Sequence, residues 1–542
     1  MKFKYLYILA LASLFTVTSC TLDESLGGDL VSDETISDIS GKDPAKVSAL
    51  INGISSSYIK YNSIGNRDHD DFGYAAICQY YEMNGQDFMA PDNGYNWFSA
   101  GMNYRDRTLT SDTSLLMWIV FYNVIKASND VIGLLGNSID NATEADKANL
   151  QMYLAQGYAN RAFAYFQLIQ TYQFTYVGNQ DKPGVPLVLV QGDERAKGTR
   201  ASVEEVYNVI TTDINKAIEL LEASGKAVPN KSYVSLNVAY GLKARISLVM
   251  ENWKDAAEFA KKAQSGHTPY SKSDISKPGL NDSNASSWMW ANLITEENDI
   301  VQTGIINWPS HLSSFTGNGY TTVGAYRSAS KEFWDKIATN DIRKNSWWVD
   351  GDKKAPYTDN IIVKKGTDEG PIAEVYGYLP YTNIKFGPYQ NLVLNTLNAT
   401  DWVMMRVEEM ILIEAEALVM QNKVAEGKAI LTNFLNTYRY KDGTSYETSA
   451  SSAKELQDEI WLQRRIELWG EGFALLDIKR LKKDVIRVNE NKESSYPARA
   501  RFNVKADLPN MLYLLPQKEI EASSELTQAD NNEIGKTLDP II

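Results

Sequence analysis

Aromatic and polar side chains alternate closely in three stretches of this chain, residues 87–106, 284–293 and 306–322. Such rings are frequent overall, with 12 Trp and 31 Tyr among 542 residues. A flat ring buries the apolar C–H face of a sugar, while amide, carboxylate and guanidinium groups orient the sugar's hydroxyls. The candidate ligand-binding residues are therefore Asp92, Asn96, Trp97, Tyr104, Arg105, Trp288, Trp290, Trp308 and Tyr320.

For each aromatic residue taken singly, packing in a small core beneath a long loop is the competing interpretation. Trp288 and Trp290 alternate, so in an extended segment both rings would face the same side. The pattern predicts that at least one of the rings contacts a ligand, and it does not decide which.

Motifs for catalysis are missing from the sequence. The three histidines lack HExxH-like spacing, and there is no GxSxG elbow or P-loop. Asp68, Asp70 and Asp71 could suggest calcium, but the loop lacks the glutamate that such a site places twelve positions along. We predict a binding protein without catalytic residues, cofactor or metal. A surface glycoside hydrolase that uses two of the many carboxylates remains an alternative.

Length and charge narrow the class of protein further. A chain of 542 residues allows one or two packed units. The formal net charge is −14, and a net acidic surface repels the phosphates of nucleic acids. We therefore predict no nucleic-acid partner, whereas a neutral sugar is unaffected by this charge.

Helical periodicity accounts for most of the chain and frames the aromatic stretches. Four long irregular inserts interrupt it, at about 62–111, 173–201, 265–330 and 340–400, and loops of this length are usually functional. The sequence predicts helices over 44–61, 112–135, 147–172, 203–223 (with Ser202 as N-cap), 235–250, 253–264, 403–421, 424–439 and 453–472.

Small residues recur at spacings typical of paired antiparallel helices. Ala244, Ala256 and Ala263 lie 12 and 7 positions apart, and Ala417 and Ala429 again 12 apart. Tetratricopeptide-type repeats use small side chains where two helices pack closely. We predict a mainly α fold, a bundle of tetratricopeptide-like helix pairs with an irregular, long-loop ligand-binding face. Generic helical hairpins are the alternative.

The first residues predict export and lipidation. Lys2 and Lys4 precede an apolar run too short to span a bilayer, and Cys20 follows small residues. We predict a lipoprotein signal peptide over 1–19, lipidation of Cys20, an acidic tether over 20–43 and one domain over 44–542. The protein would then be anchored in a membrane through lipid only. Cys78 is expected to be a small buried side chain.

Several separated motifs resemble one family, and they occur in a matching order. The chain resembles the SusD/RagB family, the outer-membrane nutrient-binding lipoproteins of Bacteroidetes. The segments that carry this resemblance are MRVEEMILIEAEAL (405–418), IWLQRRIELWGEGFALLDIKRL (460–481), ANRAFAYFQLIQTY with GVPLV (159–172 and 184–188) and YLLPQKEIEASSELTQADN (513–531).

The resemblance implies a place and a task. It implies a lipid-anchored protein of the outer membrane that faces the exterior, captures a glycan and delivers it to a SusC-like TonB-dependent transporter. Peptide capture within the same family and a purely structural repeat scaffold are the alternatives. The motifs themselves imply a scaffold, and we expect a structural ion-pair network among Arg464, Arg465, Glu467, Glu471, Asp477 and Arg480.

Overall fold

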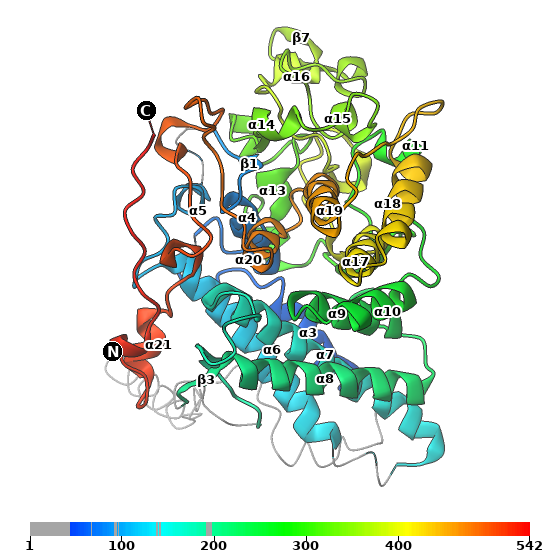
Figure 1. The fold of residues 1–542 in the computed structure, drawn as a ribbon, viewed down its shortest axis with the longest axis vertical. Coiled ribbons are helices and arrows are strands. Elements are labelled where there is room, and N and C mark those ends of the chain that lie inside the picture. Colours follow the sequence, from blue (N-terminus) through cyan, green and yellow to red (C-terminus); the bar gives the residue numbers. More distant parts are fainter. Residues whose placement is uncertain are drawn as a thin grey trace, which may run out of the picture.

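Helices predominate in the computed structural model, which describes residues 44–66, 68–91, 95, 97–136, 139, 142–190 and 198–541 (Figure 1). The longer helices lie where the apolar periodicity predicts them, which confirms the mainly α fold. Their bounds are α3 (Pro44–Ser57), α4 (Tyr74–Met83), α6 (Asp112–Gly136), α7 (Glu144–Tyr172), α8 (Val203–Ser224), α9 (Leu236–Val249), α10 (Trp253–Ala263), α17 (Val407–Met420), α18 (Val424–Tyr438), α19 (Ala453–Glu467) and α20 (Ala474–Arg480).

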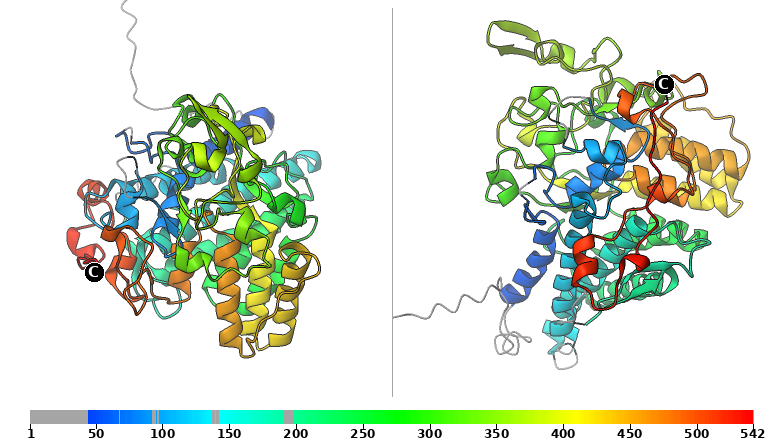
Figure 2. Two further views of the ribbon diagram at one scale, coloured as in Figure 1. Left: turned by 90° about the horizontal axis from the view of Figure 1, so that it is seen from above. Right: turned by 90° about the vertical axis from the view of Figure 1, so that its left-hand side faces the viewer.

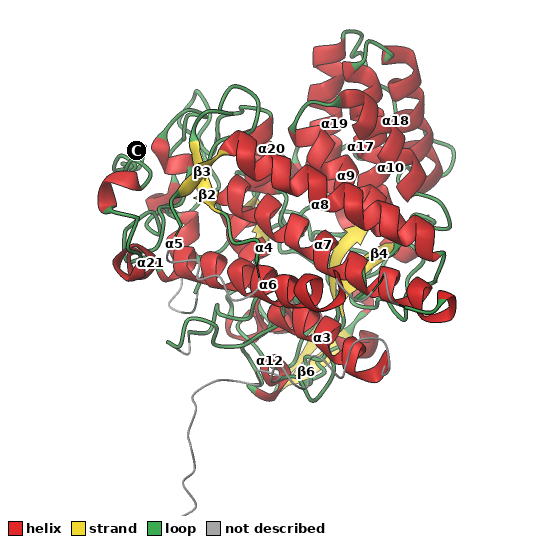
Figure 3. Cartoon of the chain, turned by 90° about the horizontal axis from the view of Figure 1, so that it is seen from below, coloured by secondary structure: helices red, strands yellow, loops and turns green. Residues whose placement is uncertain are grey.

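The helices pack as a series of neighbours, and capping residues set their ends. α7 lies between α6 and α8, α9 packs against α10, and α17 contacts α10, α18 and α19. Figure 3 shows these helices side by side when seen from below. Ser202 caps α8 as predicted, since its side chain accepts from Glu205 N while Glu205 accepts from Ser202 N at 2.7 Å. Gly225 ends the same helix in the left-handed conformation.

Small residues sit at the helix contacts, with one correction to the sequence prediction. Ala244, Ala256, Ala263 and Ala417 are fully buried. Ala429 is exposed, and the close approach of α18 to α17 instead occurs at Gly427. A Cβ there would lie 2.5 Å from the carbonyl oxygen of Ala415, closer than side chains tolerate. The period of 12 therefore does not extend to this pair.

The long inserts contain short elements of their own. The short helices are α5 (Ser99–Met102), α11 (Lys272–Ile275), α12 (Asp299–Gln302), α13 (Trp308–Leu312), α14 (Lys331–Trp334), α15 (Arg343–Ser346), α16 (Ile372–Val375) and α21 (Gln517–Ala522). Single 3-10 turns are η2 (Thr321–Val323), η3 (Thr358–Asn360), η4 (Tyr389–Asn391), η5 (Ala498–Ala500), η6 (Pro509–Met511) and η7 (Gln528–Asp530).

Strands form only small antiparallel pairs among the described residues. The pairs are β1 (Phe88–Met89) with β5 (Ser328–Ala329), β2 (Pro183–Pro186) with β3 (Arg200–Ser202), β4 (Trp288–Asn292) with β8 (Trp402–Arg406), and β6 (Ile362–Lys365) with β7 (Asp368–Pro371). The β4–β8 pair carries a bulge and ties the third insert to the start of α17. The β6–β7 hairpin projects from one end of the molecule (Figure 2).

Helix α4 is the element that sequence periodicity missed, because it lies inside the insert predicted over 62–111. All ten of its residues are buried, so it has no polar face to alternate with an apolar one. Cys78 lies on this helix and is fully buried, as predicted.

Helix α6 is long and apolar enough to cross a membrane by length and composition, the only one among the described residues. It packs against α3 and α7, and 67% of its most apolar stretch is buried. Its apolar character is therefore that of a core helix. The signal peptide, the tether and Cys20 lie outside the described residues.

Candidate functional site

Four rings gather where the first and third inserts meet: His69, Tyr95, Trp97 and Tyr320, here called the aromatic platform. His69 stacks on Trp97 with ring centroids 4.8 Å apart, and its Nδ1 bonds to the hydroxyl of Tyr320. The ring centroid of Tyr95 lies 6.5 Å from that of Tyr320. Trp97 is 38% exposed and Tyr95 56%, so both present ring surface to solvent.

Two buried rings, His311 and Phe72, lie behind the platform and support it. His311, on α13, stacks on Tyr320 with centroids 4.6 Å apart and on Phe72 at 5.4 Å. Its Nε2 lies 2.8 Å from the carbonyl oxygen of His69. Gly319 lets the following loop lie against Ser310, because a Cβ there would fall 2.5 Å from Ser310 Cα. Contacts within the fold thus hold the ring of Tyr320 and the backbone of His69.

A cleft of about 260 Å³ adjoins the exposed edge of the platform. Trp97 and Arg105 line it together with Asp68, Asp70 and Asp112. Burial and the nearby charge of Asp112 raise the pKa of Asp68. Burial raises the pKa of Asp70 to about 7, although a hydrogen bond from Tyr80 opposes that shift. The cleft therefore offers carboxyl acceptors, a guanidinium donor and an aromatic face in one place.

These three kinds of group suit recognition of a polyhydroxylated ring. An exposed indole covers the apolar face of a sugar, and carboxyl and guanidinium groups exchange hydrogen bonds with its hydroxyls. Asp71 also lines the cleft, but it is buried and its Oδ2 accepts from Ile64 N at 2.9 Å to close the turn. Among the described residues, no cluster of His, Cys, Asp and Glu has the geometry of a metal site.

The structure separates the predicted site residues into three groups. Trp97, Arg105 and Tyr320 belong to the platform and its cleft. Tyr104 is buried, donates to the carbonyl of Asn84 and lies under the guanidinium of Arg107 at 4.7 Å, so it supports the site from inside. Asp92 and Asn96 lie outside the described residues.

Trp288, Trp290 and Trp308 require a correction, because they are core residues that leave no ring face open to a ligand. Each is at most 1% exposed. Trp290 packs on Phe163 with centroids 5.0 Å apart, and Trp308 on Trp402 at 5.5 Å. Packing beneath a long loop, the competing interpretation, holds for all three.

Sequence reasoning missed His69 and Tyr95 as members of the platform. The sequence offers His69 only as a possible metal ligand or catalytic base. Its contact with Tyr320 joins positions 251 residues apart, which no local pattern reveals. Two features of the sequence could have pointed to His69: it lies in the same insert as Trp97, and aspartates flank it.

The six residues of the predicted ion-pair network all form ion pairs, but they do not form one network among themselves, because Glu467 and Glu471 pair with cations outside the set. Glu467 accepts from Arg343 at 2.8 Å, from Arg406 at 2.6 Å and from Arg439 at 2.7 Å. Burial favours the neutral acid, but the three guanidinium groups outweigh it and hold the pKa of Glu467 well below its usual range. Arg406 also pairs with Glu471 at 2.8 Å, which ties two of the sequence motifs together.

The remaining residues of the predicted network form two further sets of ion pairs. Asp477 pairs with Arg464 at 2.8 Å and with Arg480 at 2.7 Å. Arg465 instead reaches Asp87 at 2.6 Å, in the first insert.

The same motif also positions α4, which leads directly from the platform loop. Glu82 on α4 accepts from the backbone N–H groups of Gly472 and Phe473, at 2.9 Å each. Burial raises the pKa of Glu82 to about 7. The loop that bears His69 enters α4 five residues later, so the scaffold motif indirectly fixes the platform.

The fold is a bundle of helices with an irregular loop face that carries the platform. A model of the SusD family matches residues 257–532, and a model described as starch-binding and associating with the outer membrane matches residues 61–248. The first match covers half of the chain, and the protein belongs to the SusD family.

Relatives and solved structures agree with this membership. The chain is 24% identical over 410 residues to SusD-like protein P2 of Formosa agariphila, which is 69% of this chain and 73% of that protein. A SusD-like carbohydrate binding protein from Bacteroides vulgatus superimposes with a TM-score of 0.70 at 22% identity, over 91% of this chain and 98% of that one. A SusD superfamily protein from Bacteroides thetaiotaomicron superimposes with a TM-score of 0.69 at 18% identity, over 91% of this chain and 100% of that one.

Proposed function

We propose that this protein captures a glycan at the outer surface of the outer membrane and delivers it to a SusC-like TonB-dependent transporter. Lipidation of Cys20 would hold it there. The observation that carries the glycan proposal is the platform, in which the exposed Trp97 lies beside a cleft of carboxyl groups and Arg105. Family membership supports a role in binding, and the transporter and the delivery step are part of the proposal.

Calorimetric titration of the purified protein tests the capture step. The panel holds neutral polysaccharides, host glycans and peptides. We expect heat of binding from at least one glycan, and Trp97→Ala should weaken that binding about tenfold or more, because a central aromatic contact is lost. Ile362→Ala, which removes another exposed apolar side chain from the distant β6–β7 hairpin, should leave the affinity unchanged.

Two outcomes would contradict the proposal. Binding of peptides without binding of any glycan would favour the peptide-capturing alternative. Release of sugar products from a bound polysaccharide, abolished by Asp70→Asn, would favour the hydrolase. Asp70 is the residue to change, because its pKa of about 7 would let it act as a proton donor.

Co-purification tests the transporter. The protein expressed with the SusC-like transporter from its own source should be isolated with it from detergent-solubilised outer membranes. Cys20→Ser should lower the fraction of this protein in the membrane, because it removes the acylated thiol. Recovery of each protein alone under mild detergent would contradict the delivery step while leaving glycan capture intact.

A further inference from the structure

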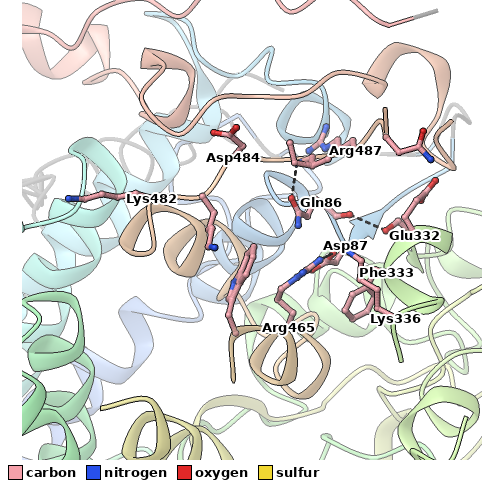
Figure 4. Close-up of a pocket in the computed structure, with 14 residues that line it drawn as sticks. Gln86, Asp87, Glu332, Phe333, Lys336, Arg465, Lys482, Asp484 and Arg487 are labelled. Carbon is pink, nitrogen blue, oxygen red and sulfur yellow. Dashed lines mark hydrogen bonds and ion pairs between the residues drawn. The ribbon is translucent and has the colours of Figure 1, made fainter. Parts of the chain in front are cut away.

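A second and larger pocket, of about 670 Å³, lies between α14, α19 and the segment that follows α20 (Figure 4). It shares no lining residue with the cleft beside the platform. Its volume falls within the range of small-molecule sites in proteins, about 300–1,000 Å³. The platform contributes nothing to it, whereas Trp461 and Arg465 of the 460–481 motif form part of its wall.

The walls of this pocket are fixed by hydrogen bonds among segments far apart in the chain. Arg465 on α19 clamps Asp87 with two bonds of 2.6 and 2.5 Å. Gln86 accepts at Oε1 from Ile486 N at 2.7 Å and at its carbonyl from Ser330 at 3.0 Å. A ligand would therefore enter a site that is already formed.

The lining carries an excess of positive charge. Five cationic residues against three acidic ones give +2, in a chain whose net charge is −14. The cationic residues are Lys336, Arg465, Lys482, Lys483 and Arg487, and the acidic ones Asp87, Glu332 and Asp484. The pocket is thus opposite in sign to the protein as a whole.

Three of these cations, Lys336, Lys482 and Arg487, form no ion pair with a carboxylate among the described residues. Lys482 donates to the carbonyl oxygen of Val177. Arg487 is 2% exposed and donates to the backbone carbonyls of Met83, Gly85 and Met102. The ammonium group of Lys336 has no hydrogen-bond or ion-pair partner within the part of the chain that the structure describes. The side chain of Lys336 is exposed at the pocket. Partial burial of its ammonium group and the neighbouring Arg465 lower the pKa of Lys336, although Asp87 and Glu332 oppose the shift.

An aromatic wall accompanies the charge. Trp461 lines the pocket, and the guanidinium of Arg465 lies 4.7 Å from its ring centroid. The ammonium of Lys483 lies 5.4 Å from the same ring. An indole beside several cations combines a surface for a sugar ring with a field that attracts an anionic substituent.

We propose that this pocket binds an acidic oligosaccharide, whose carboxylate or sulfate ester contacts Lys336 while a sugar ring lies against Trp461. The site goes beyond the proposed function, because it works independently of the platform. Both sources of negative charge, a uronic acid and a sulfated sugar, satisfy the same unpaired ammonium group.

Calorimetry at an ionic strength of about 0.01 M, where charges are weakly screened, tests the proposal. The probes are trigalacturonate, a sulfated galactan trisaccharide and the uncharged galactan trisaccharide. Both acidic probes or one of them should bind more tightly than the uncharged one. Lys336→Gln should weaken that binding about tenfold, and Lys336→Glu more, since a charged contact is lost or reversed.

Controls separate this site from the platform and from loss of folding. Lys226→Gln removes an exposed lysine just beyond α8 and should change nothing. Trp97→Ala should leave binding of the acidic probe intact, even if it abolishes binding at the platform. Lys336→Gln should melt at the same temperature as the unmodified protein, because it breaks no ion pair. Equal binding of all three probes, or equal losses in Lys336→Gln and Lys226→Gln, would overturn the proposal.

Discussion

The imidazole of His69 lies against the indole of Trp97, with ring centroids 4.8 Å apart and planes 20° from parallel. The same imidazole bonds through Nδ1 to the hydroxyl of Tyr320. One histidine thus ties together two platform rings that come from different inserts. The geometry of the platform therefore depends on the charge state of this histidine.

This dependence predicts that ligand binding weakens in acid. Burial lowers the pKa of His69 from its usual value near 6.5, although Asp68 opposes the shift, so the folded protein favours the neutral ring. A depressed pKa means that the contribution of His69 to folding stability is complete above pH 6.5 and is lost as the pH falls through the folded value. Protonation also removes the lone pair with which Nδ1 can accept the Tyr320 hydroxyl, so we expect the platform to bind ligand less well once His69 is charged. Affinity measured between pH 5 and 8 should fall at the acidic end.

Variants identify the titrating group behind this pH dependence. His69→Phe keeps the stacking on Trp97 and removes the titration of His69, so the loss of affinity in acid should become smaller than in the unmodified protein. Asp70 also titrates here, with a pKa of about 7, and Asp70→Asn should retain the acidic loss that comes from His69. If His69→Phe loses affinity in acid as steeply as the unmodified protein, His69 is not the sensor.

Removal of one charge from the buried network should be costly. Glu467→Gln leaves Arg343, Arg406 and Arg439 facing a neutral amide, and breaking a buried pair in this way costs about 3–5 kcal/mol. Urea denaturation should show this loss as a lower free energy of unfolding. Because the pKa of Glu467 is depressed, its stabilisation is also lost as the pH falls below about 4.3.

A surface pair provides the matched control for this substitution. Glu258 and Lys262 are paired at 2.8 Å on α10 with both side chains nearly half exposed. Glu258→Gln should leave the unfolding midpoint unchanged, because solvent screens such pairs. An equally small effect of Glu467→Gln would contradict the structural importance of the buried network.

Many of the long helices are predictable because they alternate an apolar face with a polar one. Helix α8 follows this rule from its N-cap Ser202 to Gly225. Helix α4 breaks it, since burial on every side removes the alternation. Ala429 was misjudged because spacing alone does not show which small residue faces the neighbouring helix, a role that Gly427 has.

The site was less predictable because its contacts are long-range. Composition located the aromatic inserts, and its candidates include Trp97, Arg105 and Tyr320, which the structure brings together at the platform and its cleft. It did not distinguish them from Trp288 and Trp308, whose neighbours in space are buried rings from other segments. Exposure of an indole depends on the packing of distant residues, and no window of sequence contains them.

Close helix packing predicts opposite effects for two glycine substitutions. Gly427→Ala would place a Cβ 2.5 Å from the Ala415 carbonyl and from Val419 Cγ2, and this overpacking should lower stability by about 1–3 kcal/mol. Gly53→Ala on α3 meets nothing within 4 Å and should raise stability by about 0.5–1 kcal/mol, since alanine is the better helix former. Thermal melts of both variants measure the difference, and equal shifts would contradict the tight α17–α18 contact.

Trp290 and Trp97 are both candidate ligand contacts by sequence, and their substitution should affect two different properties, stability and glycan binding. Trp290→Ala removes a core ring packed on Tyr58 and Phe163, and such truncations cost about 3–5 kcal/mol. Trp97→Ala removes a ring that is 38% exposed, so it should cost much less stability while it weakens glycan binding. Denaturation and calorimetry on both variants form a complete comparison. Loss of binding in a fully folded Trp290→Ala protein, with none in Trp97→Ala, would move the ligand site away from the platform.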